Sequence, residues 1–153
     1  MYPEGHFGLT LALASILMIP FGDTPESTYF IIIATLLASL PDIDLAWQRK
    51  GIPIHHRGPT HSILFALVCG VLSGIVMVYL YKNWVYFFIG LGAGLVGIMS
   101  HLIGDVLTYM AFKPLWPFSK KEISFGLFSA ANETVNKAMV ALGVLCFVIY
   151  AMQ

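Results

Sequence analysis

Charged side chains are scarce in this sequence. Asp, Glu, Lys and Arg make up 10% of the 153 residues, whereas a soluble domain carries about 25%. The 8 basic and 8 acidic residues cancel to a formal net charge of zero, so the chain has no overall field that attracts a polyanion. These shortages argue against an ordinary water-soluble globule, and we expect no nucleic-acid partner.

Cysteine is also scarce, and several signals of soluble enzymes are missing. The 2 cysteines, Cys69 and Cys146, lie inside apolar runs and are interpreted as small apolar residues, which argues against a disulfide framework or a thiolate zinc site. The sequence has no phosphate-binding glycine loop and no GxSxG nucleophile motif. Its start, Met1 to His6, lacks the positive region and cleavage site of a secretory signal, so we expect the first apolar run to persist in the mature protein.

Long apolar runs, in contrast, are abundant. Hydrophobic residues make up 58% of the chain, and its mean hydropathy is +0.82. Ser62–Tyr81 carries no charge and, at about 1.5 Å per residue, matches the ~30 Å hydrocarbon core of a bilayer. Trp84–Met110 and Ala138–Met152 are further candidate spans, and two runs of 13 and 12 residues, Phe7–Ile19 and Tyr29–Leu40, precede them. The first two runs are short spans or a half-inserted hairpin.

We therefore predict an all-α fold, a polytopic integral membrane bundle of about five hydrophobic helices with the first two short, in a single membrane-embedded domain over residues 1–153. Ile123–Ala130, in the loop Phe112–Asn132, is apolar enough to lie at the interface but lacks periodicity, and no helix is predicted there. The GxxxG spacings at Gly70 and Gly74 and at Gly90 and Gly94 indicate close helix packing inside the protein.

Lysine and arginine are distributed unequally between the two sides of the predicted bundle. With five segments, the N-terminus, the loop after the second segment and the loop after the fourth share one side, and the opposite side offers only Lys82. By the positive-inside rule the N-terminus of this multi-pass membrane protein is expected to be cytoplasmic, and membrane lipids are its expected partners. The basic residues on that side are Arg49, Lys50, Arg57, Lys113, Lys120 and Lys121.

The side chains that can carry chemistry are few and fall on the same predicted side. An ionisable group inside an apolar segment is costly and normally faces the bundle interior or a water-filled cavity, so each one marks a candidate functional site. The set consists of His6, Asp42 and Asp44 of the PDID motif, His55, His56 and His61 of the HHRGPTHS motif, and His101 with Asp105.

His101 and Asp105 are four residues apart, which places both side chains on one face of a helix. Imidazole and carboxylate ligands together suit zinc, manganese or iron(II). A metal with such ligands generates a hydroxide nucleophile near neutral pH, and Asp105 could bridge two ions. The combination fits hydrolysis of a phosphoester, with Arg57 placed to form a bidentate contact with the phosphate.

The order of these motifs resembles a known family. His6, PDID, HRGPTHS, His101-Leu-Ile-Gly-Asp105 with Thr108, and Pro117-Phe118-Ser119 are similar to the LexA-regulated, membrane-bound metal-dependent hydrolases, the YdjM-like family. The resemblance covers most of the chain and implies an inner-membrane hydrolase. A more distant similarity to zinc-dependent phospholipase C, an all-helical enzyme, implies His6, Asp42 or Asp44, His61, His101 and Asp105 as metal ligands. No histidine follows His101, so at most two ions are expected.

These observations predict a membrane-bound metal-dependent hydrolase that acts on a phosphoester, with a lipid as one candidate substrate. One or two divalent ions are expected, zinc first, with manganese and iron as alternatives. Asp42 is a ligand or the general base, and His56 and Arg57 lie near the leaving group or the phosphate. The sequence indicates no oligomeric state. The candidate ligands are His6, Asp42, Asp44, His61, His101 and Asp105.

Structural interpretations stay open for single residues. The aspartates of PDID could end or cap a helix, Thr60 could cap the third segment, and Arg57 could pair with lipid headgroups. His101 and Asp105 could form a buried ion pair, and His55 is interpreted as a loop residue.

Two other functions are alternatives. One is a small transporter or ion-conducting protein in which the His and Asp cluster relays protons or passes a metal, and the other is a silent scaffold with a structural metal. Transport requires polar groups that continue to the far side of the membrane. Between Ser100 and Trp84 the fourth segment offers none, and the third offers only Ser73 in its middle.

Overall fold

The computed structural model describes residues 1–53 and 56–153, and this part of the chain is helical without a strand. Five of its helices are long and apolar enough to cross a membrane, which confirms the predicted all-α fold. The elements are α1 (Pro3–Met18), η1 (Ile19–Phe21), α2 (Pro25–Leu37), η2 (Leu40–Asp42), α3 (Ile43–Arg49), α4 (Ile63–Tyr81), α5 (Val85–Val106) and α6 (Glu133–Ala151), where η marks a 3-10 helix.

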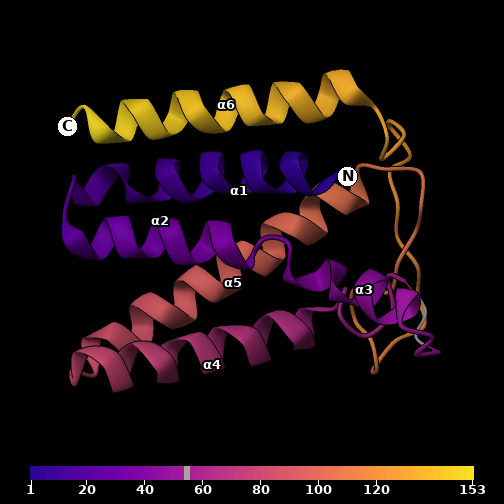
Figure 1. The fold of residues 1–153 in the computed structure, drawn as a ribbon, viewed down its shortest axis with the longest axis horizontal. Coiled ribbons are helices and arrows are strands. Elements are labelled where there is room, and N and C mark those ends of the chain that lie inside the picture. Colours follow the sequence, from indigo (N-terminus) through magenta and orange to yellow (C-terminus); the bar gives the residue numbers. More distant parts are fainter. Residues whose placement is uncertain (54–55) are drawn as a thin grey trace.

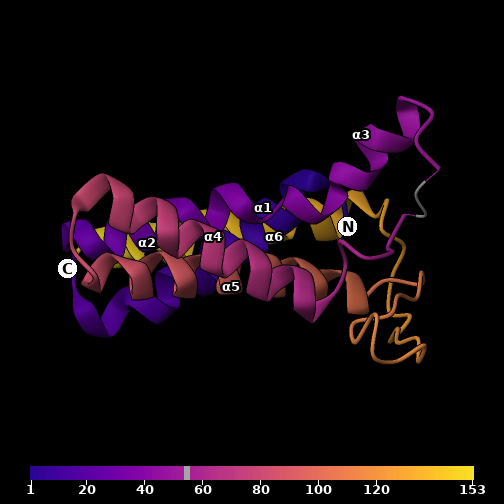
Figure 2. The same ribbon diagram turned by 90° about the horizontal axis from the view of Figure 1, so that it is seen from below.

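The long helices form an elongated bundle. Helices α6, α1 and α2 lie side by side, and α5 crosses obliquely from α4 toward the start of α1 (Figure 1). The N-terminus, α3 and the loop between α5 and α6 gather at one end, which we call the N-terminal end (Figures 1 and 2). The C-terminus and the turns after η1 and α4 lie at the other end, called the C-terminal end. The predicted grouping of loops by side is therefore confirmed.

The first two helical segments are longer than predicted. Helix α1 and η1 together form a candidate span of 19 residues, Pro3–Phe21, and the path Pro25–Arg49 reaches 25 residues, although α2 alone has 13. A count of apolar residues stops at polar positions such as His6 and Ser27, but both are buried helical residues here. They face neighbouring helices, so they do not interrupt the span. The two candidate spans therefore exceed the apolar runs, although α1 with 16 residues and α2 with 13 are the shortest of the five spanning helices, as predicted.

Local sequence signals explain where the helices begin. The Thr24 hydroxyl accepts a hydrogen bond from the Ser27 amide at 3.2 Å and caps α2. Ser62 does the same for α4, since its hydroxyl accepts from the Phe65 amide at 3.1 Å. The alternative that Thr60 caps this helix is wrong, because its hydroxyl donates to a carboxylate of Asp44 instead.

Glycines allow α4 and α5 to pack closely. A Cβ atom added at Gly94 would lie 2.7 Å from the Cα of Gly70, and one added at Gly90 would lie 2.8 Å from the Cα of Gly74. Neither distance leaves room for a side chain. The GxxxG spacings therefore serve packing inside the protein, as predicted, and this contact fixes the course of α5.

The loop between α5 and α6, residues 107–132, has no helix. Phe112 and Ile123 pair through two backbone hydrogen bonds of 3.2 and 2.9 Å, and an isolated bridge joins Thr108 to Phe128. The prediction that Ile123–Ala130 is not helical is confirmed. These pairs fold the loop back on itself, so that it stays beside the end of α5 (Figure 1).

Candidate metal centre

The candidate residues converge at the N-terminal end of the bundle. They come from five different parts of the chain, which the fold brings to one place (Figure 1). His55 lies outside the described residues. The converging residues are His6 of α1, Asp42 of η2, Asp44 of α3, His56 and His61 of the connection before α4, and His101 and Asp105 of α5.

Most of this cluster is removed from solvent. His6, His61, His101 and Asp44 are 0% exposed, and Asp105 is 1% exposed. Asp42 and His56 are half-buried. Burying several carboxylates is costly unless cations or hydrogen bonds compensate them, so the burial itself requires a partner for this negative charge.

Four ligand atoms of the cluster lie close to one another, around the two facing nitrogens of His61 and His101. The Nε2 atom of His61 lies 3.2 Å from Nε2 of His101, 3.4 Å from Oδ2 of Asp105 and 3.5 Å from Oδ1 of Asp42. Nε2 of His101 lies 3.6 Å from Oδ2 of Asp105 and 3.7 Å from Oδ1 of Asp42. In a tetrahedral zinc site with bonds of about 2.1 Å, neighbouring ligand atoms are about 3.4 Å apart. These five separations suit neighbouring ligand atoms of one ion, and we call Nε2 of His61, Nε2 of His101, Oδ1 of Asp42 and Oδ2 of Asp105 the four-atom set.

Hydrogen bonds orient both imidazoles of this set. Nδ1 of His101 lies 2.7 Å from the Ala38 carbonyl oxygen, which can only accept, so Nδ1 carries the proton and Nε2 presents its lone pair. Nδ1 of His61 lies 3.1 Å from the Thr60 hydroxyl and 3.5 Å from Oδ2 of Asp44. Outer partners of this kind are typical of metal-ligating histidines.

Asp44 lies on the outer side of His61. Its Oδ2 accepts from the Arg57 amide at 3.0 Å and from the Thr60 hydroxyl at 3.1 Å, and its Oδ1 lies 3.0 Å from Nδ1 of His56. Asp44, His56 and His61 form a second group whose ligand atoms lie within 4.8 Å of one another. Asp44 can therefore orient His61 or contribute to a second ion.

His6 lies on the other side of the four-atom set. Its ring stacks on His101 with 3.7 Å between centroids, and its Nε2 lies 3.3 Å from Oδ1 of Asp105. Within the described part of the chain, neither ring nitrogen has a hydrogen bond of acceptable geometry, although the ring is fully buried. A buried imidazole with two unpaired nitrogens is rare, and ligation of a cation would satisfy one of them.

Arg57 is part of the same network. Its Nη2 donates to Oδ1 of Asp105 at 2.7 Å and to the Thr108 hydroxyl at 3.0 Å, and its Nη1 donates to the Met110 carbonyl. The side chain is 6% exposed, so the alternative that it pairs with lipid headgroups is not what the structure shows. Because Arg57 binds Oδ1, Oδ2 of Asp105 is left for the four-atom set.

The charges around His61 favour a cation at its ring. Burial lowers the pKa of His61, but the hydrogen-bonding carboxylates of Asp105 and Asp42 raise it more, and Asp44 adds to the effect. The pKa of His61 is therefore above its ordinary value. The His61 ring in this site therefore binds a proton more tightly than a free imidazole in water does. A metal ion at the same nitrogen would compete with that proton.

The cluster is accessible through a cavity of about 400 Å³. Its wall includes Asp42, His56, Arg57 and Asp105, together with Arg49 of α3 and Met110 of the following loop. A second cavity of about 480 Å³ lies against the other side of His56 and Arg57 and reaches Trp116. A small ligand can therefore reach the half-buried face of the cluster from outside the bundle.

Comparison with known families now identifies the chain. The model of the YdjM inner membrane proteins matches residues 1–153. The chain belongs to this family. None of the curated proteins and none of the solved structures matches it.

Membership of the YdjM family confirms the resemblance found in the motifs. With the five apolar helices, it makes the chain a multi-pass inner-membrane protein whose outer helix faces contact lipid. For this YdjM protein the His and Asp cluster is a group of residues that could hold a metal ion.

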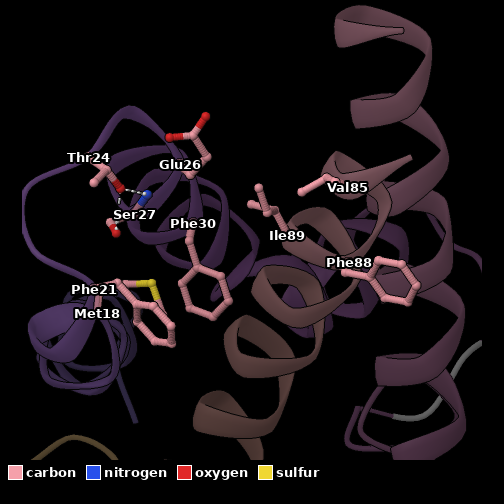
Figure 3. Close-up of a pocket in the computed structure, with 9 residues that line it drawn as sticks. All are labelled: Met18, Phe21, Thr24, Glu26, Ser27, Phe30, Val85, Phe88 and Ile89. Atoms are coloured by element: carbon pink, nitrogen blue, oxygen red, sulfur yellow. Dashed lines mark hydrogen bonds between the residues drawn. The ribbon is translucent and has the colours of Figure 1, made fainter. Parts of the chain in front are cut away.

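Another cavity of this YdjM protein, of about 500 Å³, lies at the C-terminal end and lacks such chemistry. Figure 3 shows it between apolar side chains such as Phe30 and Ile89. The carboxylate of Glu26 at its rim accepts a hydrogen bond from the Tyr86 hydroxyl at 2.8 Å. Size alone therefore does not locate the functional site, whereas the convergence of ligand atoms does.

Sequence reasoning missed several supporting groups. The Ala38 carbonyl leaves no signal in the sequence, because any residue supplies a carbonyl. Thr60 adjoins His61, but the same pattern also fits a helix cap. Arg49 was counted only as a basic residue for orientation, although it lines the cavity.

Proposed function

We propose that this protein is a membrane-bound metal-dependent hydrolase of phosphoesters, with one or two divalent cations at the N-terminal end. The observation that carries the proposal is the four-atom set, in which both histidine nitrogens lie 3.2 to 3.7 Å from each other and from the carboxylate oxygens of Asp42 and Asp105, a spacing that suits ligands of one ion. Nitrogen and carboxylate donors without thiolate favour zinc, with manganese or iron(II) as alternatives. A cation held there supplies Lewis acidity toward water and phosphoryl oxygens.

His6 and Asp44 extend the set on opposite sides. Each shares a group with atoms within 4.8 Å of one another, His6 with His101 and Asp105, and Asp44 with His56 and His61. A second cation would take its ligands from one of these groups. Two cations held by these neighbouring groups would stabilise charge on both the attacking and the leaving oxygen of a phosphoester.

The cavity supplies the groups that act on the substrate. Asp42 is half-buried with its carboxylate at the cavity wall, where it serves as a ligand or as the base that accepts a proton from water. His56 is also half-buried, and Asp44 orients its ring through Nδ1, so it is placed to protonate a leaving group. Arg57 brings a fixed positive charge to the same wall, and its buried Nε has no partner among the described residues.

Phosphoesters suit this combination better than uncharged substrates. Two arginines, Arg49 and Arg57, line the cavity whose floor is acidic. The guanidinium of Arg57 lies where it can attract a phosphoryl group, while the carboxylates hold the cations that neutralise the rest of its charge. Because lysine and arginine concentrate at this end, we place it at the cytoplasmic face.

The experiment uses the full chain, purified in detergent, stripped of metal and reloaded with zinc, manganese or iron(II). Bound metal is quantified, and release of p-nitrophenol from bis(p-nitrophenyl) phosphate is measured. We expect one or two equivalents of metal and metal-dependent turnover. Asp42→Asn and Asp105→Asn should lower turnover at least 100-fold. Asp23→Asn, at the C-terminal end, is the matched control and should retain it.

The same preparation separates the alternatives. Metal flux into proteoliposomes without turnover of any phosphoester in a panel of headgroup and nucleotide esters would favour transport and overturn the proposal. Bound metal with neither flux nor turnover would favour a structural scaffold. Absence of stoichiometric metal in the parent protein, with equal residual metal in Asp105→Asn, would remove the basis for all three interpretations.

A further inference from the structure

The loop between α5 and α6 exposes large apolar side chains at the N-terminal end of the bundle. Phe118 is 84% exposed, Phe125 is 70% exposed, and Tyr109 and Leu127 are 66% and 64% exposed. The loop lies beyond the last turn of α5, outside the spanning helices (Figure 1). Several large apolar residues exposed together mark a surface that another phase or partner covers.

Lysines are interleaved with these apolar residues. The loop contains three lysines, Lys113, Lys120 and Lys121, and one acidic residue, Glu122. Glu122 pairs with Lys113 at 3.3 Å. The surface therefore carries net positive charge next to aromatic side chains. Aromatic residues prefer the headgroup level of a bilayer, and lysines are attracted to anionic lipids there.

The position of the loop favours the bilayer over a protein partner. The loop directly continues α5, a candidate membrane-spanning helix whose Ile103, one turn before the loop, is exposed. A segment attached to the end of such a helix reaches the headgroup layer without any rearrangement. The exposed apolar residues of the loop thus follow directly after the lipid-facing residues at the end of α5.

The same loop also forms part of the opening to the candidate metal centre. Met110 and Ala130, near its two ends, line the cavity that contains Asp42 and Asp105. Across the opening lies α3, which contributes Leu45, Ala46 and Arg49. Figure 2 shows α3 and the loop on opposite sides of the bundle at this end. At this opening Ala46, Arg49 and Met110 are exposed, whereas Arg57 is buried.

We infer that loop 107–132 lies in the anionic headgroup layer and opens the cavity toward it, so that the substrate is an amphiphilic phosphoester of the membrane. The choice of substrate rests on the proposed hydrolase function, whereas the placement of the loop does not. The phosphate reaches Arg57 and the metal ligands, and the acyl chains stay in the bilayer.

The placement is tested by fluorescence of Trp116, which is 39% exposed in this loop. A variant with Trp47→Phe and Trp84→Phe leaves Trp116 as the single tryptophan and is reconstituted into phosphatidylglycerol vesicles. We expect at least twofold quenching by lipids brominated near the headgroup and weak quenching by acrylamide. Strong quenching by acrylamide alone would show a water-exposed loop. Protection from both quenchers would show a covering protein or second copy, and either result would overturn the inference.

The substrate class is tested with two esters that share one scissile bond. Metal-loaded protein receives dioleoyl phosphatidic acid in mixed micelles or water-soluble dibutyryl phosphatidic acid. Phe118→Ser with Phe125→Ser should lower turnover of the long-chain ester at least tenfold and leave that of the short-chain ester within twofold. Phe21→Ser, at an exposed phenylalanine of the C-terminal end, is the matched control.

The outcomes of the two tests are distinguishable. Equal loss of turnover for both esters would overturn the membrane substrate, because the loop would then support the fold and not lipid access. Faster turnover of the short-chain ester by the parent protein would also overturn it. If neither ester is hydrolysed while other phosphoesters are, the substrate class is wrong. If no phosphoester at all is hydrolysed, the proposed function fails, and the fluorescence result still decides where the loop lies.

Discussion

The Nε2 atoms of His61 and His101 face each other at 3.2 Å, although 40 residues separate them in the chain. His101 belongs to α5, and His61 precedes α4 by two positions. Both rings are fully buried, and Nδ1 of His101 is fixed by the Ala38 carbonyl. Two lone pairs directed at one point repel each other unless a proton or a cation lies between them, so this pair is the centre of the candidate site.

If one ion joins these two rings, their contributions to metal affinity are not independent. His61→Ala and His101→Ala should each weaken zinc binding at least 100-fold, and the double variant should lose little more than either single variant. Competition with a chromophoric chelator measures the affinities. Losses that multiply in the double variant would show that the two histidines serve separate ions.

The ion pair between Arg57 and Asp105 predicts a stability change that depends on metal. Removing the guanidinium takes away the 2.7 Å partner of the buried Asp105 carboxylate, and the Met1 ammonium at 2.8 Å from the same Oδ1 is then its remaining close cation. Breaking one side of a buried pair costs about 3–5 kcal/mol, and the Met1 ammonium offsets part of this loss. Arg57→Gln should therefore lower the unfolding temperature strongly in metal-free protein. With zinc bound the loss should shrink, because the cation compensates the same carboxylate. Thermal unfolding in detergent with and without zinc measures both values, and an equal loss in the two states would argue against a cation at Asp105.

The sequence was sufficient to predict the architecture and the convergence of the cluster. Apolar runs identify helices because a bilayer allows few other structures, and basic residues in the loops group the ends of these helices. His101 and Asp105, four apart, share a helix face whatever the rest of the fold does. This is why the end of the bundle that holds the site could be predicted without any knowledge of how the helices pack.

Interactions that depend on the packing of distant segments could not be predicted. The length of α1 was underestimated because His6 is polar, although the helix buries it against α5. The ion pair that Arg57, in the connection before α4, forms with Asp105 of α5 was not predicted. Thr60 was a candidate cap, but its hydroxyl donates a hydrogen bond to Asp44. In each case the partner lies far away in sequence or competes with a local one.

The glycine contact between α4 and α5 predicts a coupling between packing and the site. A Cβ at Gly94 would meet the backbone of Gly70 at 2.7 Å, which cannot yield as a flexible side chain can. Gly94→Val should therefore destabilise the protein by at least about 1–3 kcal/mol and weaken metal binding, since α5 carries two candidate ligands. Gly92→Ala is the control, because the nearest atom, at 3.1 Å, belongs to the mobile end of the Phe30 side chain. Thermal unfolding and chelator competition measure the two effects, and a Gly94 variant as stable as the control would contradict the close packing.

The distribution of lysine and arginine predicts how the bundle is oriented in the membrane. The N-terminal end carries most of the lysine and arginine of the chain, including Lys50, whereas the C-terminal end carries Lys82. By the positive-inside rule Lys82 faces the periplasm. In intact cells with a permeable outer membrane, Lys82→Cys should react with a membrane-impermeant maleimide, and Lys50→Cys should react only after the inner membrane is opened. Both positions are exposed, while the native Cys69 and Cys146 are buried, so the parent protein supplies the background. Labelling of Lys50→Cys in intact cells would reverse the orientation and place the metal centre on the periplasmic side.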